Sequence, residues 1–222
     1  MAGAHVCIDF WHRHLAELDT DWYLRRMRDP ETTRENILKK SGVLFNTRGY
    51  KSTSISDITD ATGYTKGAIY RHFENKVELE VETLVHLSSL MLDKLRTAIK
   101  SERTAPAKLR AMFYFFESYI TKPPLKGGCP LLNAAIEADD SHPALRKAAL
   151  KILRMMRESV IAVLENGIKH GQLRRNLEVD EFATLIIASL EGAIMMSKLS
   201  GNDEDIKRVI VHLDKQVGIM TC

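Results

Sequence analysis

The sequence predicts an all-α protein in which a small helix-turn-helix domain precedes a larger helical body. Almost every segment after Thr32 repeats its apolar residues with the 3.6-residue period of an α-helix. No segment shows the strict alternation of apolar and polar residues, bounded by hairpin turns, that is typical of strands. Two short helical segments are joined by a tight turn at Gly63, which indicates a helix-turn-helix.

The composition is that of an ordinary globular protein. Of the 222 residues, 45% are apolar and 27% are charged, a balance that can bury a substantial core. No apolar run approaches the ~18 residues of a membrane span, so we expect no membrane partner. The cysteines Cys7, Cys129 and Cys222 are odd in number and far apart, which argues against a disulfide framework and for the reducing cytoplasm.

The chain is expected to divide into three parts. Residues 1–28 form an N-terminal extension, residues 29–76 the helix-turn-helix domain, and residues 77–222 the helical body. Residues 28–76 contain nine Lys and Arg against six Asp and Glu, whereas the body is close to neutral. A mildly basic head suits a polyanionic partner such as nucleic acid, although a solvated charged surface would have the same balance.

The extension contains both tryptophans, Trp11 and Trp22, but no clear helical face before Trp11. We expect it to be either disordered or the product of an upstream start, because Met27 opens a stretch that reads like a natural protein start. Translation would then begin at Met27 rather than at Met1. The His and Cys residues of the extension match no standard zinc spacing, so no metal site is expected. These residues are His5, Cys7, His12 and His14.

The head is predicted to open with two helices. The first begins near Thr32 and carries an apolar stripe opposite charged residues. Gly49 ends this helix at a position where a left-handed residue is wanted. Thr53 or Ser54 caps a second, short helix, which Gly63 ends.

The nine residues after this turn, TKGAIYRHF, are predicted to form the second helix of the helix-turn-helix. Thr65 caps this helix, and Ile69 and Phe73, four residues apart, face inward. Gly67 and Ala68 are small, so the backbone there can approach another surface closely.

The body is predicted to be helical throughout, beginning with a long helix from Val77 to about Lys100. Prolines and glycines separate the later helices, because proline starts a helix well and glycine ends one. The later predicted helices span residues 105–120, 131–138, 143–170, 180–200 and 204–217.

The helix that begins at Thr65 has the features of a DNA-recognition helix. Its N-terminal residues would face base edges in the major groove, and its free N–H groups suit a phosphate. The Tyr, Arg and His that follow, with a lysine at the start of the next helix, could hold phosphates and fix the register. The alternative is that the aromatic residues only fill the core and that the arginine is a solvated charge. The candidate residues are Thr65, Lys66, Gly67, Tyr70, Arg71, His72 and Lys76.

A run of residues in the head matches a known family pattern. The matching residues are Ile37, Leu38, Phe45, Gly49, Tyr50, Thr53, Ile55, Ile58, Ala61, Gly63, Thr65, Lys66, Gly67, Ile69, Tyr70, His72, Phe73, Lys76, Glu78 and Leu79. Together they make residues 31–79 closely resemble the N-terminal domain of the TetR family of bacterial transcriptional regulators. Small departures are Ser41 and Thr62, where the family usually has alanine, and Tyr64, where it often has valine.

The resemblance implies a three-helix DNA-binding domain followed by a helical domain that binds an effector and dimerises. It implies base contacts from Thr65, Lys66 and Gly67, with Arg71 as a further DNA contact. The phosphate contacts that it implies are Thr53, Tyr70, His72 and Lys76. The expected protein is a cytoplasmic homodimer, most simply a repressor released from operator DNA by a small apolar or amphipathic effector. Neither enzymatic activity nor a cofactor is expected.

Methionine and aromatic residues of the body are the candidate effector contacts. Such side chains adapt to irregular apolar ligands, and in this family the helices that carry them surround a central cavity. The alternative is that they are plain core residues. The candidates are Met91, Leu95, Phe113, Phe116, Tyr119, Met155 and Met156.

Two further features of the body bear on function. Cys129 lies in GGCPLLNAAIEADD, which is similar to a stretch in a subset of TetR-like sensor domains. We expect Cys129 to be a small buried side chain rather than a redox sensor, because a redox sensor would need a lowered thiol pKa.

Small residues such as Gly192 would let the helix over residues 180–200 approach a second subunit closely. The rival functions are an enzyme with Cys129 as nucleophile and a non-specific DNA-coating protein.

Overall fold

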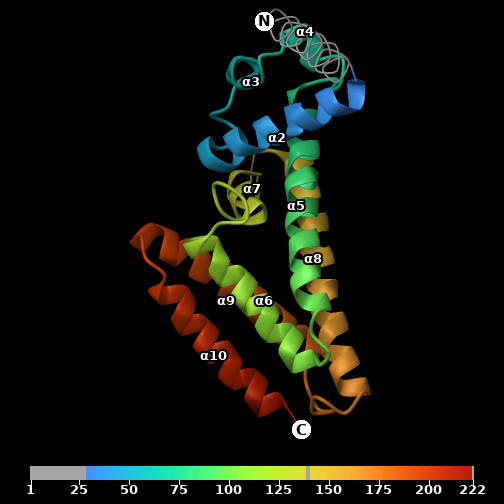
Figure 1. The fold of residues 1–222 in the computed structure, drawn as a ribbon, viewed down its shortest axis with the longest axis vertical. Coiled ribbons are helices and arrows are strands. Elements are labelled where there is room, and N and C mark those ends of the chain that lie inside the picture. Colours follow the sequence, from blue (N-terminus) through green and yellow to red (C-terminus); the bar gives the residue numbers. More distant parts are fainter. Residues whose placement is uncertain (1–28, 139–140, 222) are drawn as a thin grey trace, which may run out of the picture.

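The computed structural model describes residues 29–138 and 141–221. In this part of the chain the regular elements are helices joined by turns and loops, with one isolated β-bridge between Leu173 and Thr221. A small head lies at one end, and α5 runs from it along the body beside α8 (Figure 1). The predicted all-α fold is confirmed. The helices are α2 (Pro30–Arg48), α3 (Ile55–Thr62), α4 (Lys66–Ile69), α5 (Lys76–Lys100), α6 (Ala105–Thr121), α7 (Pro130–Ala138), α8 (Pro143–Lys169), α9 (Val179–Ser200) and α10 (Glu204–Met220).

Capping residues set the boundaries of the head helices, with two differences from the prediction. Gly49 ends α2 with a φ of 94° and a ψ of 158°, so its φ is positive as glycine permits, but the predicted left-handed helical conformation is wrong. The extended ψ directs the chain away from α2 toward α3. Ser54, and not Thr53, caps α3 through a capping box with Asp57. Gly63 ends α3, as expected, and does so in the left-handed conformation.

The helix α4 is shorter than predicted. Thr65 caps it, but its regular part covers only Lys66–Ile69. The chain then tightens into a turn, in which the N–H groups of His72 and Phe73 both donate to the carbonyl of Ile69, at 3.0 and 3.2 Å. The stretch TKGAIYRHF is therefore one helical turn followed by a tight turn, because α5 begins almost directly afterwards.

Apolar side chains from all three head helices form the core of the head. Ile37 and Phe45 of α2, Ile58 of α3 and Ile69 of α4 are fully buried, and Phe73 after α4 is nearly so. Burying a side chain of this size contributes roughly 1.5–3 kcal/mol to the free energy of unfolding. The inward orientation predicted for Ile69 and Phe73 is confirmed.

The buried core continues from the head into the body. Met91 of α5, Leu109 of α6 and Leu145 of α8 belong to the same connected cluster of buried side chains as the head residues. The helix α5 contacts both α2 in the head and α6, α7 and α8 in the body. At the far end, α10 runs past its predicted end at Val217, because Met220 is also buried in this core.

Candidate functional site

The N-terminal end of α4 is exposed to solvent. Thr65, Lys66 and Gly67 all lie on the surface, as a base-reading end requires. The φ of Gly67 is not positive, and a Cβ added to it would meet nothing within 4 Å. Neither the backbone conformation nor the packing within this chain therefore requires glycine here. The close approach of another surface to the backbone would explain it.

Polar side chains gather directly after this exposed end. Tyr70 and Arg71 are exposed, and His72 is half-buried with its ring centroid 6.4 Å from that of Phe73. The Lys66 ammonium lies 5.8 Å from the centroid of the Tyr70 ring, within cation–π range. The sequence left open whether the aromatic residues of this stretch contact DNA or fill the core. Phe73 is a core residue, whereas Tyr70 lies at the surface, where it is free to contact DNA.

Two of the predicted phosphate contacts direct their polar groups inward. The side chain of Thr53 is fully buried, and its hydroxyl donates to the carbonyl of Gly49 at 2.8 Å. The ammonium of Lys76 donates to the Tyr50 carbonyl at 2.9 Å and pairs with Glu80 Oε1 at 2.9 Å. Both residues shape the turn between α2 and α3. The Thr53 hydroxyl is committed to this turn, and Lys76 keeps one of its three donor positions for another partner.

A buried carboxylate links this turn to the body. Glu80 is only 3% exposed, and besides Lys76 it has His142 Nε2 at 2.6 Å from its Oε2. Because His142 Nδ1 accepts the N–H of Leu145 at the start of α8, Nε2 is the ring nitrogen that carries a proton and donates to Glu80. The four-residue spacing of Lys76 and Glu80 on one helix could have predicted their ion pair from sequence. The contact between Glu80 and His142 could not be predicted, because only the fold brings these two residues together.

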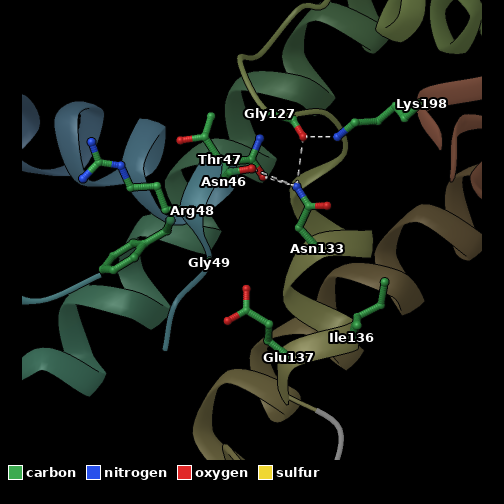
Figure 2. A pocket seen from close by; sticks show the side chains of 10 residues that line it. Asn46, Thr47, Arg48, Gly49, Gly127, Asn133, Ile136, Glu137 and Lys198 are labelled. Atoms are coloured by element: carbon green, nitrogen blue, oxygen red, sulfur yellow. Dashed lines mark hydrogen bonds between the residues drawn. The ribbon is translucent and has the colours of Figure 1, made fainter. Parts of the chain in front are cut away.

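A polar junction joins the end of α2 to the α6–α7 loop, α7 and α9 (Figure 2). Asn46 donates to the carbonyl of Gly128 at 2.9 Å. Asn133 of α7 donates to the backbone and side-chain oxygens of Asn46, at 3.1 and 2.9 Å. Lys198 of α9 donates to the carbonyl of Gly127 in the same cluster. The last turn of α2 in the head is therefore held directly by the α6–α7 loop and by α7, and Lys198 of α9 in turn holds that loop.

Glu137 completes this junction from α7. Its two carboxylate oxygens accept the N–H groups of Tyr50 and Lys51, each at 3.1 Å. Tyr50 is thus held on both sides, by Glu137 on its N–H and by Lys76 on its carbonyl. Most residues that the body contributes to the junction lie in the stretch GGCPLLNAAIEADD. The similarity of this stretch to a part of other sensor domains was therefore the feature of the sequence that could have pointed to these residues.

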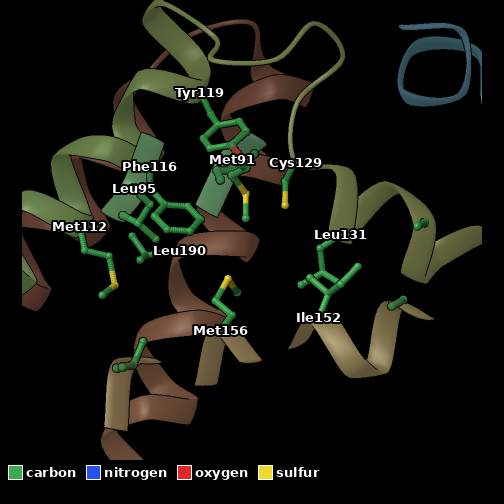
Figure 3. Close-up of a cluster of buried hydrophobic side chains, with 14 of the residues drawn as sticks. Met91, Leu95, Met112, Phe116, Tyr119, Cys129, Leu131, Ile152, Met156 and Leu190 are labelled. Atoms are coloured by element: carbon green, nitrogen blue, oxygen red, sulfur yellow. The ribbon is translucent and has the colours of Figure 1, made fainter. Parts of the chain in front are cut away.

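The predicted effector residues fall into two groups. All but Met155 are buried, and Figure 3 shows most of them in one cluster in the body. The buried members are Met91, Leu95, Phe113, Phe116, Tyr119 and Met156. Met155 is 45% exposed because it lies on the outer face of α8, where it lines a groove of about 230 Å³ with Leu95 and Met156. A second cavity, of about 310 Å³, lies between α7, α8 and α9.

Cys129 is a buried side chain, which confirms the expectation from sequence. Its Sγ donates to Glu191 Oε1 at 3.0 Å. Burial and the neighbouring Glu191 raise the pKa of the Cys129 thiol well above its usual value. A thiol with a raised pKa is a poor nucleophile at neutral pH, so the geometry supports neither a reactive sensor nor a catalytic cysteine at this position.

Within residues 29–138 and 141–221, no group of three or more His, Cys, Asp or Glu side chains could hold a metal ion. The remaining predictions for the N-terminal extension lie outside the described residues. These concern His5, Cys7, His12, His14, Trp11, Trp22, Met1 and Met27.

The helix α9 carries an exposed apolar stripe. Leu185, Met195, Met196 and Leu199 are exposed, with Leu199 at 82%, and a Cβ added to Gly192 would meet nothing within 4 Å. By length and composition, α9 is the one described helix that could cross a membrane, a test that core helices of soluble proteins also pass. Only 33% of its apolar stretch is buried, which leaves a surface suited to packing against another helix.

Comparison with known proteins assigns both halves of the chain. Residues 37–82 match the family model described as bacterial regulatory proteins, tetR family. Residues 105–213 match the model described as tetracyclin repressor-like, C-terminal domain. The two matches correspond to the head with the start of α5 and to the helices from α6 to α10.

Individual relatives agree with these models over most of their length. The repressor DhaR of Mycobacterium sp. (strain GP1) is 27% identical over 178 residues, which cover 80% of this chain and 88% of DhaR. The regulator YxaF of Bacillus subtilis (strain 168) is 30% identical over 175 residues, which cover 74% of this chain and 84% of YxaF. A TetR regulator structure from Chloroflexus aurantiacus J-10-FL has a TM-score of 0.84 at 34% identity and covers 88% of this chain and 98% of that chain.

Proposed function

The chain belongs to the TetR family of bacterial DNA-binding transcriptional regulators, and we propose that it is a cytoplasmic, dimeric repressor released from its operator by a small apolar or amphipathic effector. Membership of this family makes the protein a regulator of transcription and not an enzyme. Repression is supported by the similarity to DhaR, which is itself a transcriptional repressor.

The exposed start of α4 is the observation that carries the DNA-binding part of the proposal. Gly67 has open space in front of its backbone, and the exposed Lys66 can donate to guanine acceptors in the major groove. The side chains that follow would hold phosphates, while Thr53 and Lys76 maintain the turn behind them. The proposed DNA contacts are Thr65, Lys66, Gly67, Tyr70, Arg71 and His72.

The exposed stripe of α9 supports a dimer. In this family the last two long helices pair with those of a second subunit, and α9 and α10 pack against each other here. A Leu side chain at Gly192 would fill the space that a partner helix needs, so Gly192→Leu should weaken the dimer. Sedimentation at micromolar concentration tests this, with Ala162→Leu on the exposed face of α8 as the control. An unchanged dimer in Gly192→Leu would remove this stripe from the interface.

The junction between head and body supports a response to an effector. The helix α7 contacts α5 and α8 in the body and also holds Asn46 and Tyr50 of the head through Asn133 and Glu137. An effector that moves α7 would therefore move the end of α2 and change the spacing of the two heads in a dimer. Such an effector must bind the released state more tightly than the DNA-bound state.

Selection of bound duplexes from a random pool tests the proposed function. We expect one enriched sequence with two half-sites related by two-fold symmetry, because a symmetric dimer presents two equivalent α4 helices. Fluorescence anisotropy should then show binding at least about 1,000-fold tighter than to a random duplex at the same salt concentration. Equal affinity for all duplexes would identify a non-specific DNA-coating protein instead.

A further inference from the structure

The groove that Met155 lines lies between α5, α6 and α8, and we call it the α5–α8 groove. Its volume is about 230 Å³. The buried side chains of Leu95, Met112 and Met156 line its inner part, and Figure 3 shows all three in the buried cluster of the body. Because Met155 is 45% exposed, the groove opens to solvent, and a molecule from outside can reach its lining.

The polar side chains of the α5–α8 groove are mostly positively charged. Arg96 and Lys100, which are four residues and thus about one turn apart on α5, both line it, together with the hydroxyl-bearing Ser159 of α8. Among the described residues, no acidic side chain lines this groove. The other lining residues are all Leu, Ile, Val or Met. The groove therefore combines apolar walls with two cations from one helix.

Both cations are available to a ligand. Nη1 of Arg96 pairs with Oδ1 of Asp93 at 2.9 Å on the exposed face of the same helix, which leaves the other guanidinium nitrogens for a further partner. Within residues 29–138 and 141–221, Lys100 forms no ion pair. Arg157 on α8, by contrast, pairs with Asp180 on α9. An exposed ion pair within one helix is worth little, so Arg96 can bind a second anion at small cost.

The chemistry of the lining selects a class of ligand. The two cations disfavour an organic cation, and the apolar walls disfavour a polyol. A volume of about 230 Å³ equals that of about eight water molecules at about 30 Å³ each. It suits a ligand of about ten non-hydrogen atoms, because bonded atoms lie closer together than water molecules do.

The head group that fits best is a carboxylate. The planar guanidinium of Arg96 can donate two parallel hydrogen bonds to its two oxygens, and Lys100 adds a second charge. In a ligand of about ten non-hydrogen atoms, a carboxylate leaves most of the atoms for the apolar walls, whereas a phosphate leaves only about half. Methionine side chains such as those of Met155 and Met156 adapt well to a flexible chain.

We infer that the effector is a medium-chain apolar carboxylate, whose chain lies in the α5–α8 groove and whose carboxylate binds Arg96 and Lys100. This inference rests on the effector-responsive repressor proposed above. The groove is also connected to the head. The helix α5 contacts α2 directly, and α7, which holds the end of α2 through Asn133, contacts both α5 and α8.

Calorimetric titration of the full chain with octanoate, and with octanamide as the uncharged compound of the same shape, tests the site. We expect octanoate to bind about tenfold more tightly at low salt, and the preference to shrink at high salt because both cations are exposed. Lys100→Met should lower the preference about threefold. Lys151→Met, at an exposed lysine of α8 outside the groove, should leave the preference unchanged.

A pair of variants at Ser159 locates the carboxylate. Ser159 is exposed, so Ser159→Asp and Ser159→Asn should both fold, and their new side chains have almost the same shape. Only the aspartate adds a negative charge to the lining of the groove. Ser159→Asp should therefore bind octanoate about threefold more weakly than Ser159→Asn, whereas the two variants should bind octanamide equally.

Several results would overturn the inference. Equal binding of octanoate and octanamide, binding of neither, or equal octanoate affinity in the two Ser159 variants would each do so. An unchanged preference in Lys100→Met, or an equal loss in Lys151→Met, would also do so. If octanoate binds but leaves operator affinity unchanged in anisotropy titrations, it is not an effector.

Operator binding by the same samples separates this inference from the proposed function. Specific operator binding without any preference for octanoate defeats only the carboxylate site. Loss of all sequence preference among duplexes defeats the repressor itself.

Discussion

The start of α4 and the junction between head and body both carry polar side chains, but use them in opposite ways. Lys66 is exposed at the start of α4, and the backbone of Gly67 faces open space. At the junction, Asn46, Asn133 and Glu137 are all occupied by hydrogen bonds within the chain. Polar groups left free on a rigid support are available to a partner, whereas paired groups fix the position of that support.

The glycines of the two regions make the contrast measurable. A Cβ at Gly127 would lie 2.2 Å from the backbone oxygen of Asn46, and the φ of Gly127 is +100°. A Cβ at Gly67 would meet nothing, and its φ is ordinary. Glycine at position 127 is therefore required by the fold, and glycine at position 67 is expected to serve the contact with DNA.

The largest effect is expected for Gly127→Ala. The new Cβ would collide with the backbone of Asn46 at a positive φ, so the free energy of unfolding should fall by about 3 kcal/mol. Urea denaturation measures the loss. Gly171→Ala is the matched control, because Gly171 has a φ of +66° but nothing within 4 Å of an added Cβ, and its loss should be about 1 kcal/mol. Equal losses would show that the collision is relieved at little cost.

The next effect is expected for Glu137→Ala. The variant leaves the N–H groups of Tyr50 and Lys51 without their acceptor, and we expect a loss of about 2 kcal/mol in the free energy of unfolding. Glu165→Ala, at an exposed glutamate on α8, should cost little. If the two variants were equally stable in urea, Glu137 would not hold the head to the body.

A smaller effect, on binding only, is expected for Lys66→Ala. If Lys66 contacts a base, the variant should lose about 1.5 kcal/mol of affinity for the cognate operator and less for a random duplex. Tyr70→Phe is the comparison, because loss of a phosphate contact should weaken binding to both duplexes about equally, by roughly 1 kcal/mol. Equal losses on both duplexes for Lys66→Ala, in anisotropy titrations, would make Lys66 a backbone contact.

The smallest effect on folding is expected for Gly67→Ala. Alanine is the better helix former by roughly 1 kcal/mol and meets no neighbour, so the free energy of unfolding should not fall. Operator affinity should nevertheless fall about tenfold, or 1.4 kcal/mol, because the methyl group would hold the backbone away from the DNA. Full operator affinity in a stable Gly67→Ala variant would remove the contact with DNA as the reason for this glycine.

The sequence was a good guide where neighbours in the chain decide the structure. Helix periodicity, the Thr65 cap and the end of α3 at Gly63 were all predicted, because each depends on residues within one or two turns. It was a weaker guide at Gly49 and at the end of α4. There the conformation depends on where the next helix has to begin, and local propensity does not contain that information.

For the candidate sites too, the sequence predicted best what depends on residues close together in the chain. The exposed cluster of Lys66, Gly67 and Tyr70 could be predicted because it is contiguous in sequence and matches a family pattern. The exposure of Met155 was open to the same reasoning, since the buried residues of α8 recur every three or four positions through Met156 and leave Met155 beside that stripe. The prediction erred there by treating the two neighbouring methionines alike.

By itself, the sequence determined the all-α class, the helix-turn-helix and the residues that its exposed end presents. Only the tertiary structure decided that Glu80 meets His142, that Asn46 meets Asn133, and that Cys129 meets Glu191. The physical reason is range. Helix periods and caps are set by hydrogen bonds and side chains a few residues apart, whereas the partner of a buried polar group is set by which distant helices pack together.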